Sequence, residues 1–138
     1  MHTLNFDGCS KGNPGPAGAG AVIYYLDSEC SAEYKYLGDH YSNNQAEYAG
    51  LIMGLERAKR LDIKRLKVEG DSLLIINQMR GTYKCNSPNL LDLYKQAKEL
   101  ETWFEHIEYS HVLRHKNKRA DALANMAMKD QLKEKEPN

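Results

Sequence analysis

The sequence lacks several features that would each define a class of protein. It has only three cysteines, Cys9, Cys30 and Cys85. This odd, scattered set predicts neither a disulfide framework nor a zinc site, so we expect free thiols in a reducing compartment. Basic and acidic residues balance at 19 each. The chain therefore has no overall positive field that would indicate a nucleic-acid partner, although a local basic patch is not excluded.

Long apolar segments are also missing. No run of residues approaches the length that crosses a membrane, and the opening residues MHTLNFDG lack the basic and apolar regions of a signal peptide. We therefore expect a cytoplasmic protein with no membrane partner. The 138 residues, 41% of them apolar and 28% charged, suit one globular domain with one core.

Residue patterns predict an α/β domain with the element order βββαβααβα. The strands are expected over residues 3–7, 19–26, 32–37, 66–70 and 107–113, and the helices over residues 43–60, 72–79, 90–104 and 117–131. A turn is expected at Asn13-Pro14-Gly15-Pro16. Neighbouring early strands should pair antiparallel and strands separated by helices should pair parallel, giving a five-stranded mixed sheet with helices on both faces. We assign residues 1–130 to the domain and residues 131–138 to a disordered tail.

Four carboxylates stand in recognisable local contexts, and each has an ordinary explanation. Asp7 ends a strand beside a turn, and Asp71 is well placed to cap the helix that follows it. Asp121 fits an exposed position at the edge of the packed face of the last helix. Together, four like charges in one pocket would require a counter-charge, and a divalent cation is the usual one.

The position of Glu47 in the predicted helix has two interpretations. As the third residue of a helix capped by Asn44, it fits a capping box and a favourable interaction with the helix dipole. However, it lies one turn before Leu51, on the apolar stripe that faces the sheet. An acid in that position is partly buried and needs a partner.

The wording and order of the motifs resemble type 1 ribonuclease H. The resemblance runs from Asp7 to about Ala127, through DGCSKGNPGPAGAG, NNQAE, GDS and ADALAN. It implies a ribonuclease H-like fold and an endonuclease that cuts the RNA strand of RNA–DNA hybrids, leaving 5′-phosphate and 3′-hydroxyl ends. It also implies a monomer with no obligatory protein partner.

The same resemblance implies that Asp7, Glu47, Asp71 and Asp121 bind two Mg²⁺ ions, with Mn²⁺ as a possible substitute and with Asp7 bridging both. Carboxylate oxygens suit such hard cations. One ion would activate the attacking water and the other would stabilise the leaving 3′-oxygen. A loop histidine that assists product release corresponds to His115, although His111 and the absence of such a residue remain open.

Substrate contacts are also implied by the resemblance. Asparagine can both donate to and accept from the 2′-hydroxyl that distinguishes RNA from DNA. The predicted substrate-binding residues are Gly8, Cys9, Ser10, Gly12, Asn13, Ser42, Asn43, Asn44 and Ser72. Of these, Ser42 is expected to contact a DNA phosphate, and Cys9 is not expected to take part in thiol chemistry. The cluster Arg114, Lys116, Lys118 and Arg119 suits a phosphate partner or a solvated surface.

One departure from the family pattern concerns the basic insertion that some members use to grip the DNA strand. Residues 77–84 run almost directly into the helix near Pro88 and carry no such insertion. The chain therefore resembles a compact subclass, whose hybrid affinity should be weaker and more salt-sensitive. A non-catalytic hybrid-binding module, another metal nuclease of the same fold and a purely structural role for the acids are the alternatives.

Overall fold

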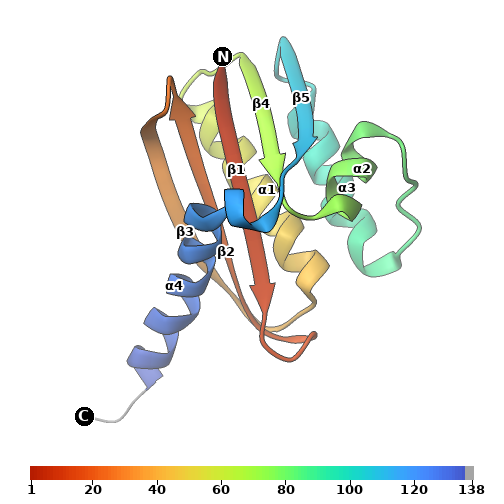
Figure 1. Ribbon diagram of the computed structural model, residues 1–138. Coiled ribbons are helices and arrows are strands. Elements are labelled where there is room, and N and C mark those ends of the chain that lie inside the picture. The colour runs from red at the N-terminus through yellow and green to blue at the C-terminus, as the bar shows by residue number, and fades with distance from the viewer. Residues whose placement is uncertain (136–138) are drawn as a thin grey trace.

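The computed structural model describes residues 1–135, which form a five-stranded sheet packed between helices (Figure 1). The strands are β1 (His2–Ser10), β2 (Gly15–Tyr25), β3 (Ser28–Tyr41), β4 (Arg65–Gly70) and β5 (His106–His111). The helices are α1 (Asn43–Arg60), α2 (Leu73–Arg80), α3 (Pro88–Glu101) and α4 (Lys118–Lys135), with a short 3₁₀ turn, η1 (Arg114–Lys116), before α4. The predicted element order is confirmed.

The sheet has the order β3-β2-β1-β4-β5 and is mixed, as predicted. Strands β1, β2 and β3 pair antiparallel, whereas β4 pairs parallel with both β1 and β5. Helix α1 packs behind the sheet and α4 crosses its front face, while α2 and α3 lie beside β5 and α1 (Figure 1). The central strand β1 therefore has a helix on each face.

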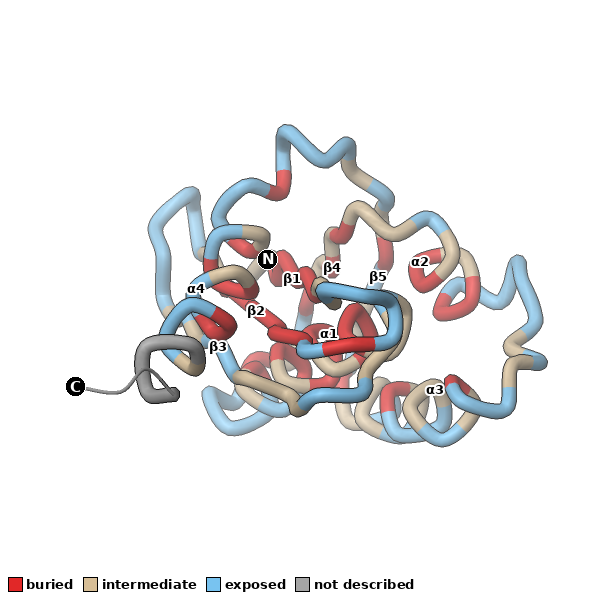
Figure 2. The backbone as a smooth tube through the Cα atoms, turned by 90° about the horizontal axis from the view of Figure 1, so that it is seen from below, coloured by how far each residue is buried: buried red, intermediate tan, exposed pale blue. Residues whose placement is uncertain are grey.

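The main core lies between the sheet and α1, where the predicted apolar stripe Leu51, Leu55 and Ala58 is fully buried. Figure 2 shows buried residues following β1, β2 and the inner side of α1, with exposed residues on the outer turns. Within the described residues, no helix combines the length and the apolar character needed to span a bilayer.

The close packing of α4 on the sheet depends on two glycines of β2. A Cβ atom on Gly18 would lie 2.3 Å from the carbonyl oxygen of Ala124, and one on Gly20 would lie 2.6 Å from that of Ala120. Real Cβ atoms do not approach carbonyl oxygens so closely, and a larger side chain at either position would force the helix away. The two glycines thus fix the depth at which α4, and Asp121 on it, sits against β2.

The structure corrects the capping assignments made from sequence. Helix α1 is capped by Ser42, whose Oγ accepts from the Gln45 amide at 3.1 Å while the Gln45 side chain accepts from the Ser42 amide at 2.8 Å. Helix α2 is capped by Ser72, whose Oγ accepts from the amide of Ile75 at 3.3 Å. The predicted caps Asn44 and Asp71 were wrong, each by one or two residues.

Several boundaries differ from the predicted ones. Strand β3 extends over residues 28–41 because it pairs with β2 along nearly its whole length, although its polar sequence showed alternation only over residues 32–37. Helix α4 continues to Lys135, so residues 131–135 of the predicted tail are helical. The remainder of that tail, residues 136–138, lies outside the described residues.

Candidate active site

Three of the four predicted carboxylates meet at one point. Asp7 comes from β1, Glu47 from the first turns of α1, and Asp71 from the residue that follows β4. One ligand oxygen from each lies within 4.8 Å of the others. Asp121 of α4 lines the same cavity, which has a volume of about 340 Å³. Segments up to 114 positions apart in the sequence therefore assemble one acidic cavity.

Close backbone packing brings Asp7 and Glu47 together. A Cβ atom on Gly8 would lie 2.1 Å from the carbonyl carbon of Ala46, and one on Gly50 would lie 2.4 Å from the carbonyl oxygen of Asp7. Only residues without a side chain allow β1 and α1 to approach so closely. The glycine after Asp7 and the glycine three residues after Glu47 are thus structural requirements of the site.

Burial makes the carboxylates of Asp7 and Glu47 hard to ionise when no cation is present. Asp7 is 4% exposed, and desolvation, with the Asp71 charge nearby, raises its pKa to about 7. Burial beside the Asp7 carboxylate also raises the pKa of Glu47 well above its ordinary value. Glu47 Oε2 is buried and accepts no hydrogen bond. Clustered hard oxygen donors, one of them without a partner, fit a divalent cation.

Two asparagines are hydrogen-bonded to Asp121, Asn117 from just before α4 and Asn125 from within it. Asn125, one turn after it, donates from Nδ2 to the Asp121 carbonyl oxygen at 2.9 Å and to its carboxylate oxygen Oδ1 at 3.4 Å. Asn117, one turn before it, accepts from the Asp121 amide at 3.1 Å. The Cys9 thiol points at Asn125 Oδ1 at 3.9 Å, and burial raises the pKa of that thiol. A neutral thiol agrees with the expectation that Cys9 performs no nucleophilic chemistry.

The predicted substrate residues divide into two groups. Gly8, Cys9, Asn43, Asn44 and Ser72 line the acidic cavity, whereas Ser10, Gly12, Asn13 and Ser42 do not. Ser10 and Asn13 of the second group are hydrogen-bonded to Asn43 of the first.

The end of β1 and the loop after it are hydrogen-bonded to the start of α1. The amide of Ser10 donates to Asn43 Oδ1 at 2.8 Å, and the amide of Asn43 donates to Asn13 Oδ1 at 2.9 Å. These bonds occupy the side-chain oxygens of Asn13 and Asn43, so the side-chain Nδ2 groups of both residues are left for other partners.

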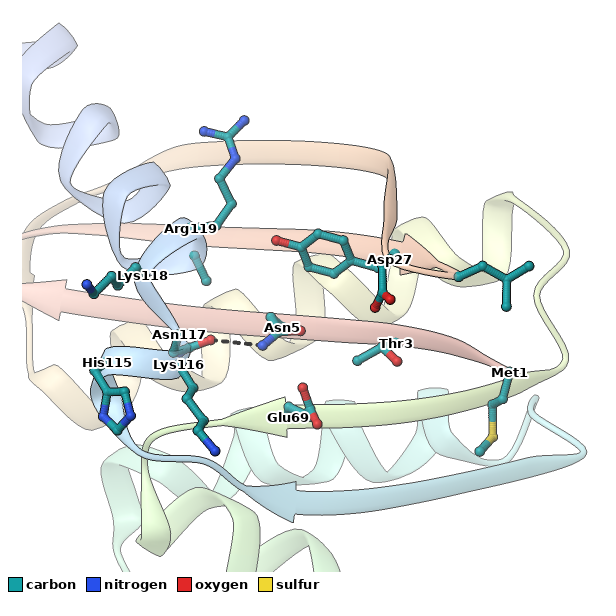
Figure 3. Close-up of a pocket in the computed structure, with 13 residues that line it drawn as sticks. Met1, Thr3, Asn5, Asp27, Glu69, His115, Lys116, Asn117, Lys118 and Arg119 are labelled. Atoms are coloured by element: carbon teal, nitrogen blue, oxygen red, sulfur yellow. Dashed lines mark hydrogen bonds between the residues drawn. The ribbon is translucent and has the colours of Figure 1, made fainter.

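The structure does not bring His115 to the acidic cavity. It lines a neighbouring cavity of about 630 Å³ on the face of β1, with Lys116 beside it and Met1 at the far end (Figure 3). Arg114, one residue earlier, lines the acidic cavity instead. The alternative loop histidine, His111, lies with Nε2 3.2 Å from the Asp71 carbonyl oxygen.

Sequence reasoning missed three residues around the acids. Arg114 was assigned only to a basic cluster, and Asn117 and Asn125 were given no function. Both asparagines stand four residues from Asp121, a spacing that places side chains on the same helical face. That spacing was the available signal.

Comparison with known proteins gives consistent matches along the chain. The family model described as reverse transcriptase-like matches residues 5–127. The chain is 42% identical over 125 residues to ribonuclease HI of Halobacterium salinarum, covering 91% of this chain and 63% of that protein. It is 48% identical over 126 residues to the bifunctional protein Rv2228c of Mycobacterium tuberculosis, covering 91% of this chain and 35% of that protein. The chain thus spans about a third of one relative and less than two thirds of the other.

Solved structures match over almost their whole length. The RNase H1 crystal structure from H. salinarum superimposes with a TM-score of 0.90 at 40% identity, covering 94% of this chain and 98% of that one. LC11-RNase H1, solved in complex with an RNA/DNA hybrid, gives a TM-score of 0.91 at 33% identity, covering 96% and 99%.

Proposed function

Because the chain belongs to the type 1 ribonuclease H family, we propose that it hydrolyses the RNA strand of RNA–DNA hybrids, largely without regard to sequence. The observation that carries the proposal is the meeting of Asp7, Glu47 and Asp71 within 4.8 Å, with Asp121 in the same cavity. All four acids come from residues 1–130, which we take as the catalytic domain. We also propose that the protein acts as a monomer in the cytoplasm without an obligatory protein partner.

The four carboxylates would hold two Mg²⁺ ions, with Mn²⁺ as a substitute. When bound, the ions supply an activated water for in-line attack on phosphorus and stabilise charge on the leaving 3′-oxygen, giving 5′-phosphate and 3′-hydroxyl products. The chain's own contribution is a rigid donor set. Asp7 and Glu47 are buried on well-packed elements, so their oxygens are positioned before a cation arrives.

Recognition of the RNA strand falls to the uncharged rim of the acidic cavity. Asn43, Asn44 and Ser72 line it beside Gly8 and Cys9, and their amides and hydroxyl suit a sugar 2′-hydroxyl. The loop bearing Ser10, Gly12 and Asn13 extends this rim, because its hydrogen bonds tie it to Asn43. We assign the DNA strand to the neighbouring surface at Ser42.

Arg114 is the best-placed group for the scissile phosphate. Among the described residues, it is the one lysine or arginine that lines the acidic cavity, and a guanidinium pairs with phosphate oxygens through two parallel hydrogen bonds. The product-release role of His115 stays a prediction of the resemblance. It would require the η1 turn to rearrange, since His115 lines the other cavity.

Cleavage of a labelled RNA–DNA hybrid tests the proposal. The assay contains Mg²⁺ or Mn²⁺, with EDTA, single-stranded RNA, duplex DNA and an Asp71→Asn variant as controls. Metal-dependent cutting of the hybrid alone, abolished in the variant, is the expected result. A folded protein that binds the hybrid without cutting it would be a binding module, and one that cuts duplex or branched DNA would be a different metal nuclease.

A further inference from the structure

Asn117 is the most deeply buried of the polar side chains in the described part of the chain, at 1% exposure. It lies between the η1 turn and α4, outside the acidic cavity, on the wall of the larger cavity (Figure 3). Burying an amide is costly unless its hydrogen bonds are made. The partners of this amide therefore show what the residue is for.

Every polar group of Asn117 is used. Its Nδ2 donates to the carbonyl oxygen of Phe6 at 2.9 Å, and its Oδ1 accepts from Asn5 Nδ2 at 3.3 Å, the bond drawn in Figure 3. Its own amide donates to the Arg114 carbonyl oxygen at 3.0 Å, and its carbonyl oxygen accepts from the amide of Asp121 at 3.1 Å. One side chain thus joins β1 to the turn that begins α4.

The hydrogen bonds of Asn117 reach the backbone on either side of the site, next to Asp7 on β1 and at Asp121 on α4. Phe6 directly precedes Asp7, and the parallel ladder between β1 and β4 ends at the Phe6–Gly70 pair. At that point the side-chain Nδ2 of Asn117 donates a hydrogen bond to the Phe6 carbonyl oxygen. On the other side, the backbone bond to Asp121 opens α4. Two consecutive hydrogen bonds therefore span from the residue before Asp7 to Asp121 itself.

We propose that Asn117 is a positioning residue that sets the separation of the Asp7 and Asp121 carboxylates for divalent-cation binding. The inference rests on the proposed metal-dependent function. Asn125 complements it by holding the Asp121 carboxylate from the following turn. Without the Asn117 side-chain amide, these hydrogen bonds no longer connect the start of α4 to β1, and the distance between Asp121 and Asp7 is no longer fixed. Outer-shell partners of this kind typically change metal affinity by about 10- to 100-fold.

The test compares Asn117→Ala with Ile63→Ala in metal titrations followed by thermal unfolding. Ile63 is a buried residue before the start of β4, at the opposite end of that strand from Asp71. Its variant therefore loses stability without touching the site. Asn117→Ala is expected to need about tenfold more Mg²⁺ for half of the stabilisation, whereas Ile63→Ala keeps the wild-type midpoint. A wild-type midpoint in Asn117→Ala would overturn the inference.

Asn5→Ala keeps the inference testable if Asn117→Ala fails to fold. It removes only the bond to Asn117 Oδ1 and keeps the one to Phe6, so a smaller rise in the Mg²⁺ midpoint is expected, and no rise would count against the inference. The titration needs no hydrolysis, so it separates the two proposals. Wild-type protein that binds Mg²⁺ but cuts no hybrid contradicts only the proposed function. Wild-type protein without any Mg²⁺ response contradicts both.

Discussion

Arg114 and His115 are consecutive residues, yet their side chains line two different cavities. Arg114 borders the cavity that holds the acids, and His115 borders the larger one over the face of β1. Both belong to the 3₁₀ turn η1. Such a turn has three residues per revolution, so neighbouring side chains point about 120° apart. The backbone of the turn thus decides which of the two residues can meet a phosphate at the acidic cavity.

Replacing Arg114 should therefore impair hydrolysis more than replacing His115. Loss of a charge-assisted contact to phosphate costs about 2 kcal/mol, which corresponds to a fall of roughly 30-fold in kcat/KM for Arg114→Ala. Arg114→Lys should restore part of the loss, because it keeps the charge but not the paired donors. His115→Ala is the matched control, with an expected change of less than about threefold, because the His115 side chain is exposed and lies outside the acidic cavity. A larger defect in His115→Ala would show that the turn rearranges on substrate binding.

The sequence predicted the acids but not what holds them. The order of elements followed from apolar periodicity, and the mixed sheet followed from connection lengths. The four carboxylates were found because their motifs are local in sequence. The roles of Arg114 and Asn117 depend on the direction of one short turn and on a bond from Asn117 to a strand 111 positions away. The four-residue spacing from Asp121 places Asn117 near that acid, but no local pattern encodes its bond to β1 or the side on which Arg114 emerges from the turn, so neither role was predicted.

The misassigned caps have a similar origin. Asn44 and Asp71 are both good capping residues by type, and a serine lies within two positions of each. Which of two adjacent candidates caps a helix depends on where the backbone turns, and that is set by the packing of the helix on the sheet. The correction matters for function, because it leaves Asn44 and Asp71 available to the cavity that they line.

Ser42 offers a separation of structural and substrate-binding roles. Ser42→Ala should lower the free energy of unfolding by about 1 kcal/mol, because it removes the cap of α1. Ser42→Asp should keep the cap and so the stability, while placing a negative charge where a DNA phosphate contact is predicted. If that contact exists, KM for the hybrid rises in Ser42→Asp more than in Ser42→Ala. Equal KM values for Ser42→Asp and Ser42→Ala, measured at the same urea concentration on fully folded samples, would reject the phosphate contact.

The stability of the metal-free protein should fall as the pH rises through neutrality. Burial raises the pKa of Asp7 to about 7, and the pKa of a free aspartate is about 3.9. A raised folded-state pKa contributes stability at low pH that is lost as the pH passes the folded value. In EDTA, the Asp7 contribution to the free energy of unfolding should therefore decrease by about 1.4 kcal/mol between pH 6 and pH 8.5, the last third of a loss that begins near pH 4.

Asp7→Asn isolates this effect from the histidines that titrate in the same window. The variant should be more stable than the wild type at pH 8 in EDTA, inactive on hybrids, and flatter in its pH dependence. With saturating Mg²⁺, the wild-type trend should weaken or reverse, because the cation replaces the protons and its affinity rises with pH. Denaturant unfolding at each pH gives the measurement. A variant that loses stability at pH 8 would contradict the buried-charge argument.

Gly20→Ala should disturb the site through the contact between β2 and α4, without altering any group that lines the acidic cavity. Its Cβ would lie 2.6 Å from the Ala120 carbonyl oxygen and 2.8 Å from the Ala124 amide nitrogen, so α4 must move away from β2. Overpacking of this kind costs about 1–3 kcal/mol. Because Asp121 lies between those two contact points on α4, the shift should also lower Mg²⁺ affinity and hydrolysis.

Gly81→Ala is the control: it strains a backbone with φ of 83° but meets no atom within 4 Å. It should cost about 1 kcal/mol and leave the Mg²⁺ midpoint unchanged. Equal Mg²⁺ midpoints in the two variants would mean that the position of Asp121 does not depend on how α4 is seated on β2.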